Sequence, residues 1–247
     1  PPTPRTTASW VRRVQRPFRF SFKLHQRFTH ERAEPPAKAE VEQFTAGLLP
    51  VHEAGLLGCL LLQFPWSFRC TRSALEWLQR VADAFAQFPL VLEVRHRSWD
   101  RPELRQQLAQ MRINYCNIDQ PQLNQCIGPS AYVTGPIGYV RLHGRRYDTW
   151  FAQNVQTHQR YDYLYSSEEL TEWLERIRQL ASQTEAVYVF ANNHYRGQGP
   201  ANALQLRSML QQKPVQVPPE LLRHFRFLRD LAEPPQSQQT RQGKLFE

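Results

Sequence analysis

The sequence predicts an α/β fold in which repeating βα units build a parallel sheet. Two observations support this prediction: short apolar runs alternate with helix-period patterns along nearly the whole chain, and every apolar run ends in polar or ionisable residues. Six such units fit either an open doubly wound sheet or a (β/α)8 barrel that lacks two strands. The chain of 247 residues is long enough to bury the core of such a fold.

Each strand is predicted from a short run that is rich in aliphatic or aromatic residues. The six predicted strands cover residues 18–24, 57–64, 90–95, 113–119, 138–144 and 186–193. The predicted helices cover 37–49, 73–85 and 166–180, and further helices begin near residues 102, 200 and 219. Capping boxes mark two helix starts, at Asp100 with Glu103 and at Ser166 with Glu169.

Composition narrows the class of protein. Lys and Arg number 31 against 22 Asp and Glu, and the resulting net charge of +9 favours an anionic partner. The four cysteines form no C-x-x-C pair, so neither a zinc ribbon nor a disulfide scaffold is indicated. No apolar run reaches the roughly 20 residues that span a bilayer, and the start of the chain lacks a signal-peptide apolar region. We therefore expect a cytoplasmic protein without a membrane partner.

We predict a single domain over residues 1–234 and a disordered polar tail over residues 235–247. The tail is rich in proline and glutamine, a composition that disfavours a packed core. Within it, Gln242, Leu245 and Phe246 fit the Q-x-x-L-F pattern of peptides that dock on the bacterial sliding clamp. Three specified positions in a short window also recur by chance, so clamp docking is a hypothesis for a partner.

The polar groups at the strand ends predict a functional cluster. Side chains two apart on a strand face the same way, and four of the strands end in a polar i, i+2 pair. In parallel strands these groups gather at the carboxyl edge of the sheet, where βα folds build their sites. The alternative is a solvated rim, or buried ion pairs that serve packing alone. The strand-end groups are Lys23, Gln63, Glu93, Arg95, Asn117, Asp119, Arg141, His143, Asn192 and Asn193.

The types of these residues favour an anionic ligand. Lys23, Arg95 and Arg141 are fixed cations suited to a phosphate or a carboxylate. Glu93 and Asp119 are the carboxylates at the strand ends, and each fits a general base, a metal ligand or a counter-ion of the arginines.

Histidines add a second kind of group to this edge. His30, His96 and His143 fit proton carriers, or ligands of a metal through a neutral nitrogen. The sequence contains no H-E-x-x-H, G-x-S-x-G, Walker or G-x-G-x-x-G motif.

Several stretches taken together resemble one known family. They are FRFSFKLHQRFTH, LGCLLLQFPWSF, LVLEVRHRSW, YVRLHGR, YDYLYSSEEL and VYVFANNHYRGQGPANALQL. In this combination the chain resembles the uncharacterised YecE-like proteins, also called the DUF72 family. The resemblance implies a TIM (β/α)8-type barrel without an established activity, and it supplies no role for any residue. Its motif positions fall on Lys23, Thr29, His30, Gln63, Glu93, Arg95, His96, Trp99, Arg141, His143, Gly144, Asn192, Asn193, Ala201 and Asn202.

The resemblance also predicts an incomplete barrel. Members of this family begin with a strand containing Gly-Trp, a helix and a second strand ending in Phe-Tyr, and this chain resembles them from just after that point. We therefore expect an N-terminally truncated member with about six βα units, in which the first βαβ unit is missing. Such a sheet exposes two edges, at strands 18–24 and 186–193.

Two functional hypotheses follow. The first is a metal-dependent or acid/base hydrolase of phosphate esters or nucleic acid, with Glu93, Asp119 and His143 as catalytic groups and as candidate ligands of a divalent metal. Its anion-binding residues are Lys23, Gln63, His30, Arg95, Arg141 and Asn193. The alternative is a non-catalytic, nucleic-acid-associated module that docks through its C-terminal tail.

Overall fold

A six-stranded parallel sheet forms the centre of the molecule. The computed structural model describes residues 1–15, 17–123, 125–152 and 154–234. The strands are β1 (Phe20–Lys23), β2 (Leu57–Gln63), β3 (Leu90–Glu93), β4 (Ile113–Asp119), β5 (Ile137–Leu142) and β6 (Ala186–Ala191). They lie side by side in chain order, and every neighbouring pair is parallel.

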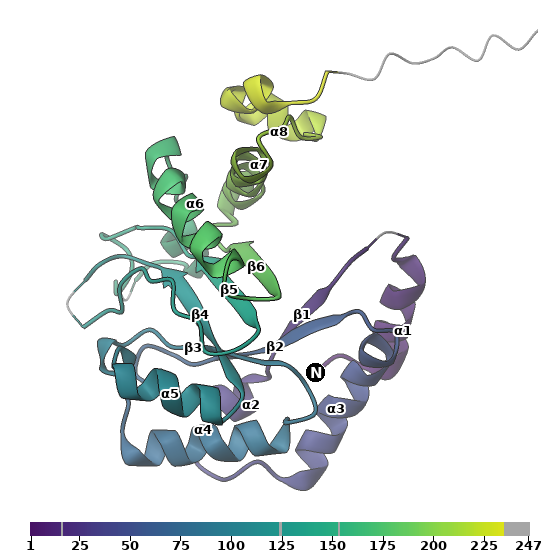
Figure 1. Ribbon diagram of the computed structural model, residues 1–247, viewed down its shortest axis with the longest axis vertical. Helices are drawn as coiled ribbons and strands as arrows, with labels where there is room; N and C mark the ends of the chain where they lie inside the picture. The colour runs from purple at the N-terminus through teal and green to yellow at the C-terminus, as the bar shows by residue number, and fades with distance from the viewer. Residues whose placement is uncertain (16, 124, 153, 235–247) are drawn as a thin grey trace, which may run out of the picture.

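This strand order decides between the two predicted sheets. A doubly wound sheet reverses its order at a switch point, whereas the strands of a TIM barrel follow one another around the barrel. The six strands curl into a half-barrel, as Figure 1 shows. The prediction of an incomplete TIM-type barrel is therefore confirmed, and within the described residues β1 and β6 each leave one edge unpaired.

A hydrogen bond across the concave face demonstrates the curvature. Ser21 Oγ on β1 lies 2.8 Å from Tyr139 Oη on β5, although three strands separate them in the sheet. Ser21 Oγ also lies 3.2 Å from Cys59 Sγ on β2. Burial raises the pKa of the Cys59 thiol to about 11, so this concave lining is neutral at physiological pH.

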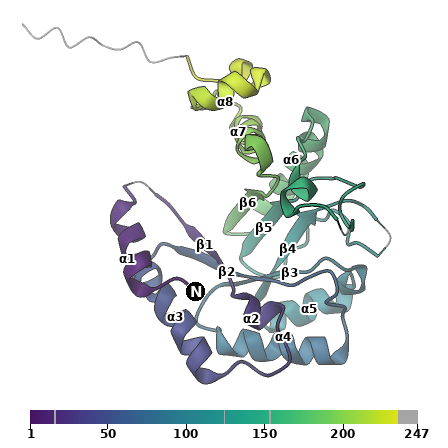
Figure 2. The same ribbon diagram turned by 180° about the vertical axis from the view of Figure 1, so that it is seen from behind.

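Helices pack along the convex side of the sheet, except the last one, which lies away from the sheet and packs against Arg226–Leu231. They are α1 (Pro4–Arg13), α2 (Gln26–Thr29), α3 (Lys38–Glu53), α4 (Arg72–Ala84), α5 (Pro102–Gln110), α6 (Ser167–Ala181), α7 (Gln198–Gln211) and α8 (Pro219–His224). Figures 1 and 2 show α3, α4 and α5 along one half of the sheet, with α6 and α7 beside β5 and β6. The sequence pattern did not predict α1 or α2, which are short or polar.

Two apolar clusters attach these helices to the strands. In the first, Phe28, Phe44 and Phe85 meet edge to face, with ring centroids 5.2–6.2 Å apart. In the second, Trp173 of α6 is fully buried together with Val140 of β5. No helix in the described part of the chain is long and apolar enough to cross a membrane.

The strand register fixes which side chains face the concave side. Registered residues of parallel neighbours point to the same face. Gln63 registers with Glu93, and Lys23 registers with Leu61, two residues before Gln63. Arg141 registers with Ile118, whereas Asp119 registers with Leu142. The polar end of β4 therefore points to the helix-covered face.

Candidate functional site

Glu93 is the centre of the polar cluster at the carboxyl edge of the sheet. Its side chain is completely buried at the end of β3. Oε1 accepts hydrogen bonds from Arg95 Nε at 3.1 Å and Nη2 at 3.0 Å, and from His143 Nε2 at 3.1 Å. Oε2 accepts from Arg141 Nη1. Both carboxylate oxygens are therefore engaged by side chains from β5 and from the segments that follow β3 and β5.

Asn192 closes this cluster into a ring. Its Oδ1 accepts a hydrogen bond from Arg141 Nη2 at 2.9 Å, and its Nδ2 lies 3.1 Å from His143 Nδ1. Because the Asn192 amide nitrogen only donates, His143 Nδ1 accepts and the imidazole proton sits on Nε2, where it is donated to Glu93. We call Glu93, Arg141, Asn192 and His143 the Glu93 ring.

The ring holds an ionised carboxylate next to a neutral imidazole. Burial alone would raise the pKa of the Glu93 carboxyl, but the charges of Arg141 and Arg95 and the His143 hydrogen bond hold it well below its usual range. Burial, followed by the charge of Arg95, lowers the pKa of His143 to about 3. His143 is therefore uncharged at physiological pH, and Glu93 is the negative charge of the ring.

Lys23 adds a further cation at the open side of the ring. Lys23 is exposed as a whole residue, but partial burial of its amino group lowers its pKa, Glu93 acts in the opposite direction, and Arg141 and Arg95 lower it further. Within the described residues, neither the Lys23 ammonium nor Arg95 Nη1 makes a hydrogen bond. Gln63, registered with Glu93, brings its amide to the same face. These donors remain available to a ligand.

Two aromatic side chains from the loop after β5 lie against the ring. The Arg95 guanidinium carbon is 5.6 Å from the Trp150 ring centroid, and the His143 ring is 6.4 Å from Trp150 and 6.3 Å from Tyr161. Trp150 is only 6% exposed, so it excludes water from one side of the cations. The sequence interpretation missed Trp150, although the aromatic density of this loop was a visible signal.

Asp119 does not join the Glu93 ring. Its two oxygens accept from Arg145 Nε at 3.1 and 3.0 Å, and Oδ2 also accepts from Trp173 Nε1 at 2.9 Å. Burial raises the pKa of Asp119, and the Arg145 hydrogen bond offsets part of this effect. Asp119 therefore ties β4 to α6, which departs from the expectation of a shared cluster.

Asn193 and His30 also lie apart from the ring. Asn193 is buried, and its Nδ2 donates to the Tyr163 carbonyl at 2.8 Å and to Asn202 Oδ1 at 2.9 Å. It connects the end of β6 to α7, and the neighbouring Asn192 occupies the ring instead. His30 follows α2 directly, with Nδ1 2.8 Å from Thr29 Oγ1, and lines a separate cavity.

The expected metal ligands are not assembled. Among residues 1–15, 17–123, 125–152 and 154–234, no group of three or more His, Cys, Asp or Glu side chains is arranged to hold a metal ion. Glu93 and His143 are hydrogen-bonded to each other, and Asp119 belongs to the separate contact with α6.

The part of the chain that matches a known family model includes every residue of the site. The family model described as "Protein of unknown function DUF72" matches residues 1–224, which include all six strands. The chain belongs to the DUF72 family. This confirms the resemblance seen in the strand-end stretches. The family description itself names no activity.

Relatives and solved structures agree with this membership. The UPF0759 protein YunF of Bacillus subtilis (strain 168) is 29% identical over 219 residues, covering 83% of this chain and 78% of that protein. The crystal structure of a DUF72 family protein from Thermotoga maritima MSB8 matches with a TM-score of 0.78 at 34% identity, covering 85% of this chain and 80% of that chain. One from Enterococcus faecalis V583 also gives 0.78, at 26% identity, covering 88% and 85%.

Replacing Asp119 should reduce stability. We expect Asp119→Asn to lower the free energy of unfolding by about 3 kcal/mol, because it removes one partner of a buried ion pair. Urea denaturation followed by circular dichroism measures this loss. Asp83→Asn on the exposed face of α4 is the matched control and should change little. An Asp119→Asn protein as stable as the unmodified chain would contradict the structural role.

The neutral state of His143 predicts a pH dependence of stability. In the folded chain its pKa is about 3, against an ordinary value of 6.5, so between these values the unfolded chain binds more protons. The free energy of unfolding should therefore fall as pH is lowered below 6.5, by up to about 1.4 kcal/mol per pH unit from this residue. Urea unfolding at pH 7, 6 and 5 measures the slope.

A pair of histidine variants isolates the residue responsible. His143→Gln keeps an N–H donor for Glu93 but cannot take up a proton, so its stability should depend less steeply on pH. His224→Gln, at an exposed position of α8, should retain the slope of the unmodified chain. Equal slopes in His143→Gln and the unmodified chain would show that another group causes the dependence.

Proposed function

We propose that this DUF72 chain binds a phosphate-bearing anion at the open carboxyl edge of its half-barrel. The observation that supports this most directly is the imbalance of charge at the Glu93 ring. Lys23, Arg95 and Arg141 contribute three positive charges, and Glu93 contributes one negative charge. With His143 neutral, a charge of +2 remains on one face of the sheet.

The arrangement of the cations suits an oxyanion. Glu93 fixes the guanidinium groups of Arg95 and Arg141, so little side-chain entropy is lost when a ligand binds. Lys23 Nζ and Arg95 Nη1 still have donors to offer, and Trp150 shields Arg95 from water on one side. Charge-assisted hydrogen bonds to a phosphate are stronger under such partial desolvation.

Hydrolysis is a less supported extension of this proposal. A general base must reach the water or substrate that it deprotonates, yet the Glu93 side chain is completely buried, its Oε1 already accepts three hydrogen bonds, and both His143 nitrogens are hydrogen-bonded within the ring. The ring would have to open before either residue took a proton from water. We therefore propose binding as the function of the ring, and keep phosphate-ester or nucleic-acid hydrolysis as the hypothesis to be tested against it.

The second candidate is a nucleic-acid-associated module that docks through its tail. The net charge of +9 favours a polyanionic partner. Gln242, Leu245 and Phe246, the residues proposed to dock on a sliding clamp, lie outside the described residues. A cytoplasmic location is part of the same proposal, and the four free cysteines support it because reduced thiols are typical of that compartment.

Lys23→Met tests anion binding without disturbing the ring. Lys23 is exposed and makes no hydrogen bond to Glu93, so the variant should fold normally. We expect its affinity for inorganic phosphate and for thymidine monophosphate to fall about tenfold, from the loss of roughly 1.4 kcal/mol. Isothermal titration calorimetry at low salt measures both ligands.

The control for this variant is Lys38→Met, which removes the same charge from an exposed position of α3. It should bind as the unmodified chain does. Equal binding by both variants, or no binding by the unmodified chain, would contradict the proposal. Arg141→Ala is a poorer test, because it leaves Glu93 buried with a lost partner and costs about 3–5 kcal/mol of stability.

An activity assay separates binding from hydrolysis. We expect no turnover of bis(p-nitrophenyl) phosphate, with or without added Mg²⁺ or Mn²⁺, by the chain that binds phosphate. Release of p-nitrophenol that disappears in Glu93→Gln and persists in Asp83→Asn would establish the hydrolase hypothesis instead. The Glu93→Gln protein must show a folded circular dichroism spectrum for that result to count.

A further inference from the structure

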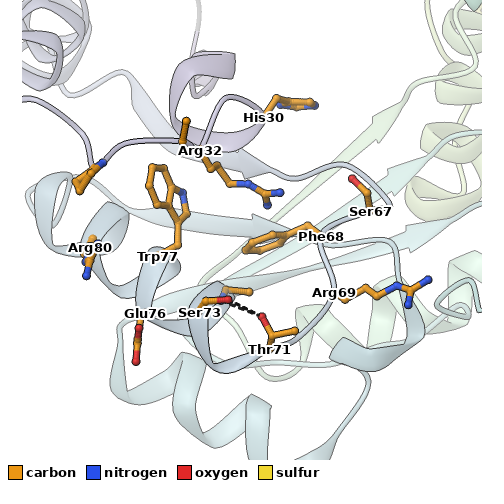
Figure 3. A pocket seen from close by; sticks show the side chains of 13 residues that line it. His30, Arg32, Ser67, Phe68, Arg69, Thr71, Ser73, Glu76, Trp77 and Arg80 are labelled. Carbon is orange, nitrogen blue, oxygen red and sulfur yellow. Dashed lines mark hydrogen bonds between the residues drawn. The ribbon is translucent and has the colours of Figure 1, made fainter.

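A basic cavity lies at the same end of the half-barrel as the Glu93 ring. Its volume is about 680 Å³, and Figure 3 shows its lining from the segment after α2, the segment after β2 and the first turns of α4. The segments after β1 and β2 leave the same carboxyl edge of the sheet that carries Lys23 and Gln63. The cavity and the ring therefore belong to one end of the half-barrel.

Arg32 is the unusual residue of this cavity. Its guanidinium carbon lies 4.4 Å from the ring centroid of Phe68, and its Nη1 is buried with no hydrogen-bond partner among the described residues. Partial burial lowers its pKa. No carboxylate within the described part of the chain forms an ion pair with Arg32, although a desolvated cation without a counter-ion is costly. An anion in the cavity would compensate this charge.

The other charged side chains that line the cavity include more cations than anions. Arg69 and Arg80 are exposed at its rim, and Figure 3 shows both at its margins. Among the described residues that line the cavity, the one acidic residue is Glu76, which already accepts a hydrogen bond from Arg72 Nε at 3.0 Å. The hydroxyl groups of Thr71 and Ser73 also line the cavity. Their oxygens lie 3.0 Å apart in a hydrogen bond to each other, so one of the two hydroxyl protons remains to donate to an oxyanion.

His30 connects the cavity to the strand-end cations. Its side chain lines the cavity, and His30 is the residue directly after α2, which begins three residues after Lys23. Burial lowers the pKa of His30 first, and the positive charges of Lys23, Arg32 and Arg95 lower it further. The imidazole therefore lies within electrostatic reach of both groups of cations.

We propose that this cavity is a second anion subsite, centred on Arg32, and that the ligand of this protein carries two phosphate groups. One phosphate binds at Lys23, Arg95 and Arg141, and the other binds at Arg32. The inference rests on the proposed function of the strand-end site and adds the class of ligand. Two phosphates occur both in a short nucleic-acid segment and in a sugar bisphosphate, so the experiment includes both.

Calorimetric titration tests the second subsite. The probes are thymidine 5′-monophosphate, the 5′-phosphorylated dinucleotide pTpT and fructose 1,6-bisphosphate, each titrated into the full chain. We expect at least one two-phosphate probe to bind tenfold or more tightly than the monophosphate. Arg32→Gln should abolish that advantage and leave monophosphate binding unchanged, whereas Lys23→Met should weaken all the probes that bind. A gain for pTpT alone identifies nucleic acid as the source, and a gain for the sugar bisphosphate identifies a small metabolite.

Two further variants secure the result. Arg178→Gln removes the same charge from an exposed position of α6 and should keep the full advantage of the two-phosphate probe. Arg80→Gln, at the rim of the cavity, should reduce that advantage in part and remains informative if Arg32→Gln does not fold. Equal affinity of the unmodified chain for all probes would overturn the second subsite but leave the strand-end site standing. A chain that binds none of them would overturn both.

Discussion

The carboxyl edge of this half-barrel depends on the compensation of one buried charge. Moving a carboxylate out of water costs several kcal/mol unless strong hydrogen bonds replace the lost hydration. Glu93 meets this requirement with Arg95, Arg141 and His143, and Asn192 joins the last two. These residues come from β5 and from the segments that follow β3, β5 and β6, so their mutual contacts also set the positions of those strand ends. The Glu93 carboxylate therefore organises this edge of the sheet, because the hydrogen bonds that stabilise its buried charge also hold the Arg95 and Arg141 side chains in place.

The sequence analysis placed catalytic and anion-binding roles in one cluster, but the structure separates them. The Glu93 ring holds the arginines in place, and Glu93 and His143 use hydrogen-bond acceptors for this purpose. Arg95 and Lys23 retain donors without a hydrogen-bond partner among the described residues, and Arg32, in the cavity at the same end of the half-barrel, retains a buried one. A surface that combines rigid cations with unfilled donors is suited to binding an anion, and membership of the DUF72 family is compatible with that proposal without adding to it.

Much of the fold was predictable because its signals are local. The six strands were located from apolar runs, and their polar ends correctly placed Lys23, Glu93 and Arg141 at one edge. Which face of a strand is concave is not a local property. Alternation pairs Asn117 with Asp119, but only the register of β4 with β5 shows that Ile118 faces the interior and Asp119 faces α6. For the same reason Asn192, and not Asn193, completes the ring, because β6 ends one residue before it. The isolation of Arg32 depends on packing between distant loops, which no sequence spacing reveals.

The hydrogen bond between Ser21 and Tyr139 has a geometric consequence for recognition. It joins β1 directly to β5 across the concave side of the curved sheet, although β2, β3 and β4 lie between them in the strand order. Lys23 follows Ser21 by two residues, and Arg141 follows Tyr139 by two residues. Because residues two apart on a strand point to the same face, each cation lies on the concave side next to one of the two hydroxyl groups. The separation of Lys23 and Arg141 is therefore constrained by the hydrogen bond between two neutral hydroxyl groups, those of Ser21 and Tyr139. In the proposed binding site, the size of the anion that fits between Lys23 and Arg141 therefore depends on the curvature of the sheet as well as on charge.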